Sequence, residues 1–166
     1  TQKITKAMKM VAAAKLRKAQ ENAEKGRPYS EKLQNIILNL TKSINDMENA
    51  PKLLSGTGKD QIYLCLVLTA DRGLCGGFNS NICKLAKMEF KKIISSGKVL
   101  KIITAGSKGY DQIKREYEKY IIKKFNFKDK KQISFKDAEL IGNEIITLFN
   151  DNEFDKCILF YNNFKN

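Results

Sequence analysis

The sequence contains no histidine, and this absence removes several kinds of chemistry at once. A Ser-His or Cys-His nucleophile is impossible, and so is any metal site with a histidine ligand. The chain also lacks an apolar run approaching the roughly 20 residues that a helix needs to cross a bilayer. Its N-terminus does not have the pattern of a signal peptide.

Cysteine occurs four times and never in the CxxC spacing of zinc-binding or thioredoxin-like sites. Cys65 and Cys157 lie in apolar runs, which predicts buried thiols, whereas Cys75 lies in a polar turn and is predicted to be exposed. A reducing, cytosolic setting is the default interpretation. We expect no metal and no cofactor.

Arginine is rare although the chain is basic. Lys and Arg number 31 against 18 Asp and Glu, a formal net charge of +13, but only four of the basic residues are arginine. Base recognition and two-pronged phosphate contacts favour arginine over lysine. The charge therefore favours solvated lysines over nucleic-acid binding, and an anionic partner of another kind stays open.

Residues 1–50 have the pattern of a long helix. Ile4, Met8 and Val11 follow helical spacing, and alanines fill the positions between them. Such small side chains allow another helix to approach closely, as in a coiled coil. We therefore expect an N-terminal shaft helix whose apolar stripe pairs with a second helix.

Gly26 and Pro28 interrupt this pattern, because proline cannot donate a helical hydrogen bond and clashes with the preceding turn. We expect the shaft to be kinked or broken near residues 26–28. Residues 51–61 are rich in Gly, Pro and Ser and predict a loop.

Residues 62–166 change to alternating strand and helix patterns. The run at 62–69 is continuously apolar, which is typical of a parallel strand buried on both faces. Ser134 and Asp137 form a capping-box pattern before a later helix. Four strands are predicted, at residues 62–69, 99–104, 120–125 and 156–161. We predict an α/β fold with a Rossmann-like, mostly parallel sheet.

A glycine-rich turn follows the first predicted strand, where a dinucleotide or phosphate loop would lie. The order of Gly73, Gly76 and Gly77 is G-x-x-G-G, which matches neither the Rossmann fingerprint nor the P-loop. Asn79 or Ser80 is expected to cap the next helix. We interpret the turn as a tight bend or a protein-contact loop.

Two further features follow strands and have weak functional signals. Asp71 has no second carboxylate or base beside it, so we expect it to pair with Arg72 or to cap the turn. Lys108 lies between two glycines after the second predicted strand. We interpret that segment as another strand-to-helix turn.

Two long motifs together indicate a family. Residues 1–20, Thr-Gln-Lys-Ile-Thr-Lys-Ala-Met-Lys-Met-Val-Ala-Ala-Ala-Lys-Leu-Arg-Lys-Ala-Gln, closely resemble the N-terminal helix of the gamma subunit of F-type ATP synthases. Residues 71–79, Asp-Arg-Gly-Leu-Cys-Gly-Gly-Phe-Asn, resemble that family's glycine loop. Residues 106–109 and 161–166 also fit, in the right order. The resemblance covers the whole chain and looks closest to the bacterial and mitochondrial branch.

The resemblance implies a rotor subunit without a catalytic site of its own. Its coiled-coil shaft would turn inside the hexamer of alpha and beta subunits, and its α/β domain would bind epsilon and the membrane ring of c subunits. Such a subunit would lie on the cytoplasmic face of a bacterial inner membrane, or the matrix side in a mitochondrion, and would reach the membrane only through the complex. Proton flow would turn the shaft and drive ATP synthesis, or hydrolysis in reverse.

The resemblance also implies positions for the contacts with partners. Ile4, Met8 and Val11 would lie on the shaft near the lower opening of the hexamer. The loop under the beta subunits would comprise Asp71, Arg72, Gly73, Leu74, Cys75, Gly76 and Gly77.

The ends of the chain depart from the family pattern. Family members begin before Thr1 and continue after Asn166 into a C-terminal helix that completes an antiparallel coiled coil. We therefore expect a fragment whose α/β domain is incomplete at its C-terminal end. The alternative function is a small nucleotide-binding α/β protein, and a basic nucleic-acid-binding module comes third.

Overall fold

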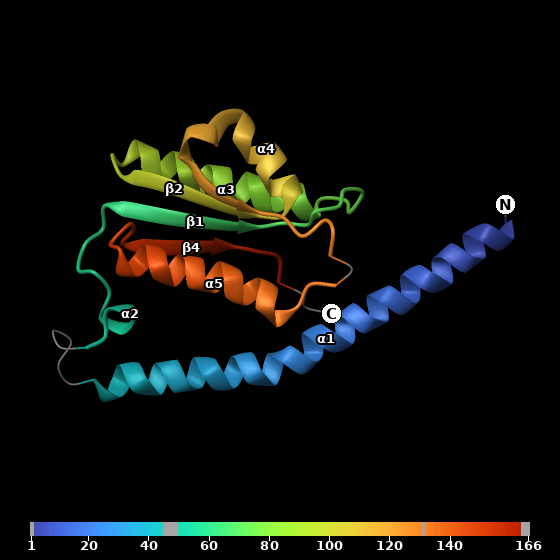
Figure 1. Cartoon of the computed structure of the whole chain (residues 1–166), viewed down its shortest axis with the longest axis horizontal. Coiled ribbons are helices and arrows are strands. Elements are labelled where there is room, and N and C mark those ends of the chain that lie inside the picture. Colours follow the sequence, from blue (N-terminus) through green and yellow to red (C-terminus); the bar gives the residue numbers. More distant parts are fainter. Residues whose placement is uncertain (1, 45–49, 131, 164–166) are drawn as a thin grey trace. The chain divides into compact units, whose positions relative to one another are not determined.

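The structure is a computed structural model that describes residues 2–44, 50–130 and 132–163. The chain divides into two compact units, with the boundary between Ser55 and Gly56. The first unit contains the long helix, and the second, Gly56–Asn163, contains the sheet (Figure 1).

The first unit is dominated by α1, Gln2–Ser43, a single helix of 42 residues. It continues through Gly26 and Pro28, so a break near residues 26–28 was a wrong alternative. Figure 1 shows one ribbon that bends part-way along its length, the form that an interior proline commonly imposes. None of the described residues of α1 is buried.

The segment expected to be a loop contains a short helix, α2, Lys52–Ser55. Its backbone turns because the carbonyl of Pro51 accepts hydrogen bonds from Leu54 N and Ser55 N, at 2.8 and 3.1 Å. Proline is well tolerated at the start of a helix, where its missing N–H is not needed. The prediction of a loop over the whole of residues 51–61 was therefore wrong for this part.

The second unit contains a four-stranded parallel sheet in the order β3-β2-β1-β4. The strands are β1, Ile62–Leu68; β2, Val99–Ala105; β3, Ile121–Phe125; and β4, Lys156–Phe160. In the register of the central pair, Ile62 lies opposite Val99. The predicted α/β fold with a parallel sheet is confirmed.

Helices cover both faces of this sheet. Three helices connect the strands: α3, Phe78–Ser95; α4, Ser107–Tyr117; and α5, Phe135–Asn150. A short 3₁₀ helix, Glu118–Tyr120, follows α4. Figure 1 shows α3 and α4 on one face and α5 on the other, the arrangement that parallel strands with helical crossovers produce.

Strand β1 contributes to a core on each face because alternate side chains of a strand point in opposite directions. Cys65 and Val67 join the cluster beneath α3 and α4. Leu64 and Leu66 join the cluster beneath α5. The largest fully buried side chain, Phe90, packs edge-on to Tyr117 with ring centroids 5.2 Å apart. The expectation that this strand is buried on both faces is confirmed.

Among the predicted thiol environments, two are confirmed and one is wrong. Cys65 is buried and Cys75 is exposed, as expected. Cys157 is exposed, because β4 lies at the edge of the sheet and has a neighbouring strand on one side only. An apolar run thus predicted a strand correctly but not how much of it is covered.

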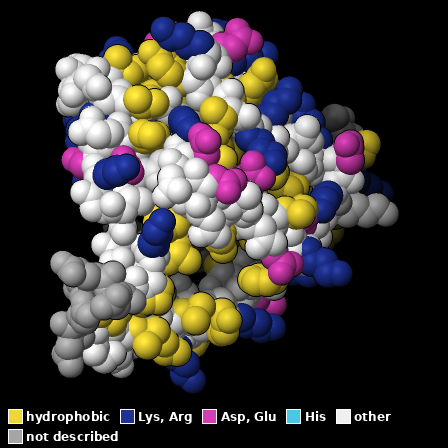
Figure 2. Space-filling model, turned by 60° about the vertical axis from the view of Figure 1, so that its left-hand side comes forward, with side chains coloured by type: hydrophobic (Ala, Val, Ile, Leu, Met, Phe, Trp, Pro, Cys, Tyr) yellow, Lys and Arg dark blue, Asp and Glu magenta, His cyan; other side chains and the backbone are white. Residues whose placement is uncertain are grey.

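Ion pairs organise the end of the sheet where the strands begin. The carboxylate of Asp60 accepts hydrogen bonds from Lys98 Nζ at 2.7 Å and Tyr63 Oη at 2.5 Å, and pairs with Lys156 Nζ at 2.9 Å. The Lys98 bond contributes most to holding the pKa of Asp60 well below its ordinary value. Figure 2 shows acidic side chains among lysines and arginines on the face that it presents. Elsewhere in the unit, Lys87, Lys101 and Lys123 each form an ion pair with a glutamate.

Candidate partner-contact site

The glycine loop leaves the carboxyl end of β1 and is folded around a buried side chain of α3. Asn79 is 5% exposed; its Oδ1 accepts a hydrogen bond from Ala70 N at 2.8 Å, and its Nδ2 donates to the Arg72 carbonyl at 3.2 Å. The same Nδ2 lies 3.2 Å from Cys75 Sγ. The side chain of Asn79 thus connects the start of the loop, at Ala70 and Arg72, with Cys75 farther along it.

This role replaces the capping role expected from the sequence. Helix α3 begins at Phe78, with Gly77 as the N-cap residue, so neither Asn79 nor Ser80 occupies the cap position. The signal in the sequence was present, an Asx residue directly after a glycine turn, but its side chain turns back into the loop because that is where unpaired backbone groups lie.

Asp71 links three loops at the carboxyl edge of the sheet. Its carboxylate accepts hydrogen bonds from Ser107 N at 2.7 Å and from Phe127 N at 3.0 Å, and its carbonyl accepts one from Ser107 Oγ at 3.1 Å. Within the part of the chain that the structure describes, no ion pair joins Asp71 to Arg72, so the alternative of an ion pair with Arg72 was wrong. The negatively charged carboxylate of Asp71 therefore satisfies the backbone N–H groups of Ser107 and Phe127.

At the start of α4, the backbone N–H groups also donate hydrogen bonds to residues that follow β1. Lys108 N donates to the Ala70 carbonyl at 3.3 Å, and Gly109 N donates to Thr69 Oγ1 at 2.8 Å. Together with Ser107 N, these are the first backbone donors of the helix, which an anion would otherwise use. This supports a plain strand-to-helix turn around Lys108 and argues against a phosphate site.

Close approach of the backbone explains the glycines of this second turn. Gly106 has φ of +106°, and a Cβ there would lie 2.1 Å from the Thr69 carbonyl oxygen. A Cβ on Gly109 would lie 2.7 Å from Thr69 Oγ1. The sequence marked these glycines only as turn residues, whereas the structure places them where the end of β1 meets α4.

The tip of the glycine loop is exposed and locally strained. Leu74 is fully exposed and has φ of +60°, a conformation that costs an ordinary residue roughly 1–2 kcal/mol. Gly76 also has positive φ, +58°, but Gly77 has φ of −79°. An apolar side chain held outward in a strained conformation is typical of a contact point for another molecule.

The predicted residues of α1 lie in the other unit and are exposed. Ile4, Met8 and Val11 are 66%, 68% and 55% exposed, respectively. They share one side of the helix by their spacing of four and three residues. Nothing in the first unit buries this stripe among the described residues.

Residues 2–44, 50–130 and 132–163 contain neither a metal-binding cluster nor a membrane-spanning helix. No group of three or more His, Cys, Asp or Glu side chains is arranged to hold a metal ion. No helix combines the length and the apolar character needed to cross a bilayer.

The whole chain matches known proteins of one kind. A family model described as ATP synthase matches residues 1–166. The chain is 68% identical over its full length to the ATP synthase gamma chain of Pelagibacter ubique, of which it covers 57%. It is 53% identical to that of Rhizobium leguminosarum bv. trifolii, covering 99% of this chain and 56% of the relative.

The chain is also similar to a chain in a solved structure of the central stalk and c-ring of the Tetrahymena thermophila mitochondrial ATP synthase. The TM-score is 0.68 at 28% identity, with 98% of this chain and 66% of that chain covered. The class of protein is thus a long helix joined to an α/β domain, similar to a protein of an ATP synthase central stalk. The chain belongs to the ATP synthase family, as the resemblance of its two motifs to gamma subunits predicts. It spans just over half the length of the curated relatives that it matches.

Proposed function

We propose that this chain is part of the central rotor shaft of an F-type ATP synthase. The observation that carries the proposal is 68% identity to an ATP synthase gamma chain over every residue of this chain. The rotor would couple proton-driven rotation of the c-ring to ATP synthesis or hydrolysis in the alpha and beta hexamer. It would do so mechanically and contribute no catalytic group.

The properties of α1 fit a shaft. At about 1.5 Å per residue, a helix of 42 residues is roughly 60 Å long. Its apolar stripe is exposed and needs a partner, which in this proposal is the C-terminal helix of the complete subunit. A stiff, asymmetric coiled coil can bias the conformations of catalytic sites that it does not enter.

Partner contacts are proposed at both candidate surfaces. Ile4, Met8 and Val11 belong to the shaft, near the opening of the hexamer. In the glycine loop, Arg72, Gly73, Leu74 and Cys75 form the exposed tip that touches the beta subunits. Asp71 and Gly76 shape the loop behind that tip.

The remaining partners are the epsilon subunit and the c-ring, which the α/β domain would bind. The chain would then be a peripheral part of a membrane complex, on the cytoplasmic side in a bacterium or the matrix side in a mitochondrion. Binding to nucleic acid is not part of this proposal.

Copurification tests the proposal directly. The complete subunit, which includes the C-terminal helix of this proposal, would be expressed with alpha and beta subunits. A stable complex with rotation-coupled ATP hydrolysis is expected. Failure of the wild-type full-length chain to join the complex would refute the rotor function.

Leu74→Ala provides a sharper test of the loop. It removes an exposed apolar side chain, so thermal stability should hardly change while coupling between hydrolysis and proton pumping should fall. Leu140→Ala, at an exposed leucine of α5, is the matched control and should leave coupling unchanged. Equal effects of both substitutions would exclude a specific contact at Leu74.

The alternative of a nucleotide site at the glycine loop finds no support in the geometry. At the neighbouring turn, the backbone donors of Ser107, Lys108 and Gly109 already bind Asp71, Ala70 and Thr69. The G-x-x-G-G order of the glycine loop itself matches neither nucleotide-binding fingerprint. Titration with ADP, followed by NMR at residues 73–77, should therefore show no saturable change there.

A further inference from the structure

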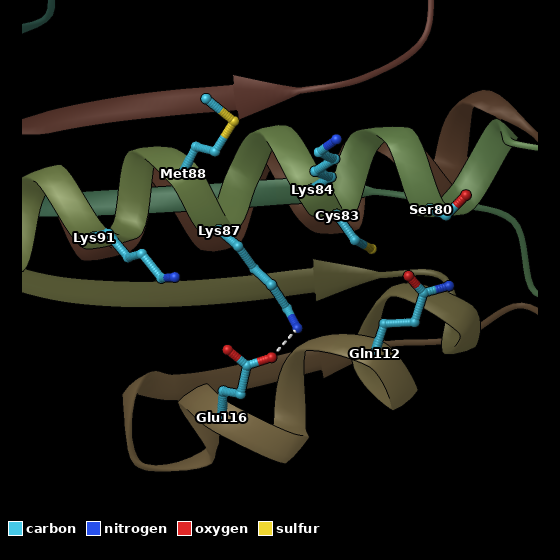
Figure 3. A pocket seen from close by; sticks show the side chains of 8 residues that line it. All are labelled: Ser80, Cys83, Lys84, Lys87, Met88, Lys91, Gln112 and Glu116. Atoms are coloured by element: carbon cyan, nitrogen blue, oxygen red, sulfur yellow. Dashed lines mark hydrogen bonds and ion pairs between the residues drawn. The ribbon is translucent and has the colours of Figure 1, made fainter.

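A groove of about 440 Å³ lies between α3 and α4, on the face of the sheet away from α5. It is lined by Ser80, Cys83, Lys84, Lys87, Met88, Lys91, Gln112 and Glu116. Figure 3 shows Lys87 from α3 and Glu116 from α4 pointing toward each other, with a dashed line marking their ion pair. The volume falls within the usual range of small-ligand sites.

The lining carries an excess of positive charge. Lys84, Lys87 and Lys91 are spaced by three and four residues, so one side of α3 presents all three. Glu116 is the one carboxylate of the lining and pairs with Lys87. Hydrogen bonding to Lys87 and, to a smaller extent, the charge of Lys91 hold the pKa of Glu116 below its ordinary value. Among the described residues, no carboxylate forms an ion pair with Lys84 or Lys91.

We propose that this groove binds a linear oligophosphate of two or three phosphoryl groups, either free or carried by a nucleotide. Lys84 and Lys91 are seven residues apart, so their backbone positions lie about 10 Å apart along the helix, which suits an extended chain of phosphates. Lys87 lies between them, and the amide of Gln112 supplies a donor from α4. Repulsion among the lysines falls when such an anion is bound.

The groove is separate from the features that carry the rotor proposal. It does not include the exposed tip of the glycine loop or any residue of α1. Its size favours a small ligand over an acidic protein segment, which would need a longer surface. A failure of this inference therefore leaves the rotor function untouched, and the reverse also holds.

Titration of the full-length chain with tripolyphosphate at low salt, followed by amide NMR, tests the site. Saturable shifts are expected at Ser80, Lys87, Lys91 and Gln112. Lys84→Gln and Lys91→Gln should each weaken binding about two- to fivefold, as loss of one exposed charge contact does. Glu116→Gln removes the competing carboxylate and should strengthen binding by a similar factor.

Lys136→Gln is the matched control, because Lys136 is an exposed lysine of α5, on the opposite face of the sheet. It should leave the affinity unchanged, and an equal weakening would show that only net charge is sensed and overturn the proposal.

A parallel titration with ATP distinguishes a free oligophosphate from a nucleotide. Equal affinity for ATP and tripolyphosphate means that the phosphates alone are recognised, and tighter binding of ATP means that the ligand is a nucleotide. Shifts centred on residues 73–77, or binding of a hexaglutamate peptide but not of tripolyphosphate, would also overturn it.

Discussion

Helix α1 and the α/β unit obtain their stability in different ways. The α/β unit buries two apolar clusters, one on each face of its sheet. Helix α1 is longer than any other element, yet none of its described residues is buried. An isolated helix is marginally stable in water because packing supplies most helical stability in proteins. One unit therefore has its own core, whereas the other leaves its apolar side chains exposed.

The largest expected difference comes from removing one apolar side chain from each unit. Phe90→Ala leaves a cavity beneath α3 and should lower the free energy of unfolding of the α/β unit by about 3–5 kcal/mol. Ile4→Ala, at an exposed position, should change it by less than about 0.5 kcal/mol. Urea denaturation followed by tyrosine fluorescence would measure both. A comparable loss from Ile4→Ala would mean that α1 belongs to the same cooperative unit.

A second pair of substitutions separates close packing from open space within the α/β unit. Gly106→Ala forces a Cβ to 2.1 Å from the Thr69 carbonyl oxygen at positive φ, and should cost about 3 kcal/mol or more. Gly142→Ala, inside α5 with nothing near its Cβ, should instead stabilise by up to about 1 kcal/mol. Calorimetric melting temperatures should move in opposite directions. A stable Gly106→Ala variant would mean that β1 and α4 can separate without cost.

A third pair tests the glycine loop itself. Gly76→Ala places a side chain at φ of +58° and should cost about 1 kcal/mol. Gly77→Ala should cost less, because its φ is ordinary and the nearest atoms belong to the flexible side chain of Asn81. Thermal denaturation of both variants distinguishes them. The reverse order would indicate that Gly77, not Gly76, determines the shape of the turn.

The smallest expected effect is on the stability of the α/β unit at acidic pH. Lys130, and next the backbone of Ser134, hold the pKa of Asp137 at about 2, below its ordinary value of 3.8. The ionised form is thus favoured in the folded state, so its stabilisation is complete above pH 3.8 and declines as the pH falls toward 2. Asp137→Asn should flatten this part of the acid-denaturation curve.

Other carboxylates limit the size of that effect, because the pKa values of Asp60 and Asp155 are also lowered. Asp151→Asn is the control, since it removes an equal charge at an exposed position. If Asp151→Asn flattened the curve as much as Asp137→Asn, general charge repulsion and not the capping box would explain the acid sensitivity.

Sequence patterns predicted most of the architecture because those patterns are local. The apolar run of β1 and the capping box at Ser134 depend on neighbours a few residues away, and both are confirmed. The continuous course of α1 through Pro28 was less predictable. A proline can bend a helix or end it, and the sequence alone does not say which.

The sequence predicted the position of the candidate site but not the roles of its individual residues. The loop of residues 71–77 lies where expected, directly after β1. The roles of Asp71 and Asn79 were missed, because their partners are backbone groups of other segments, such as Ser107 N and Phe127 N. The exposure of Cys157 was missed for a related reason, since it depends on the position of β4 at the sheet edge.

By itself the sequence determined the class of fold, the family resemblance and the absence of histidine chemistry, since periodicity, composition and motif order are properties of the chain. Only the tertiary structure decided that Gly106 must approach Thr69, and that the charges of Lys84, Lys87 and Lys91 line one groove with Glu116. Hydrogen bonds and charge interactions act over a few ångströms in space. Residues far apart in the sequence therefore acquire these relations only when the strands and helices are packed together.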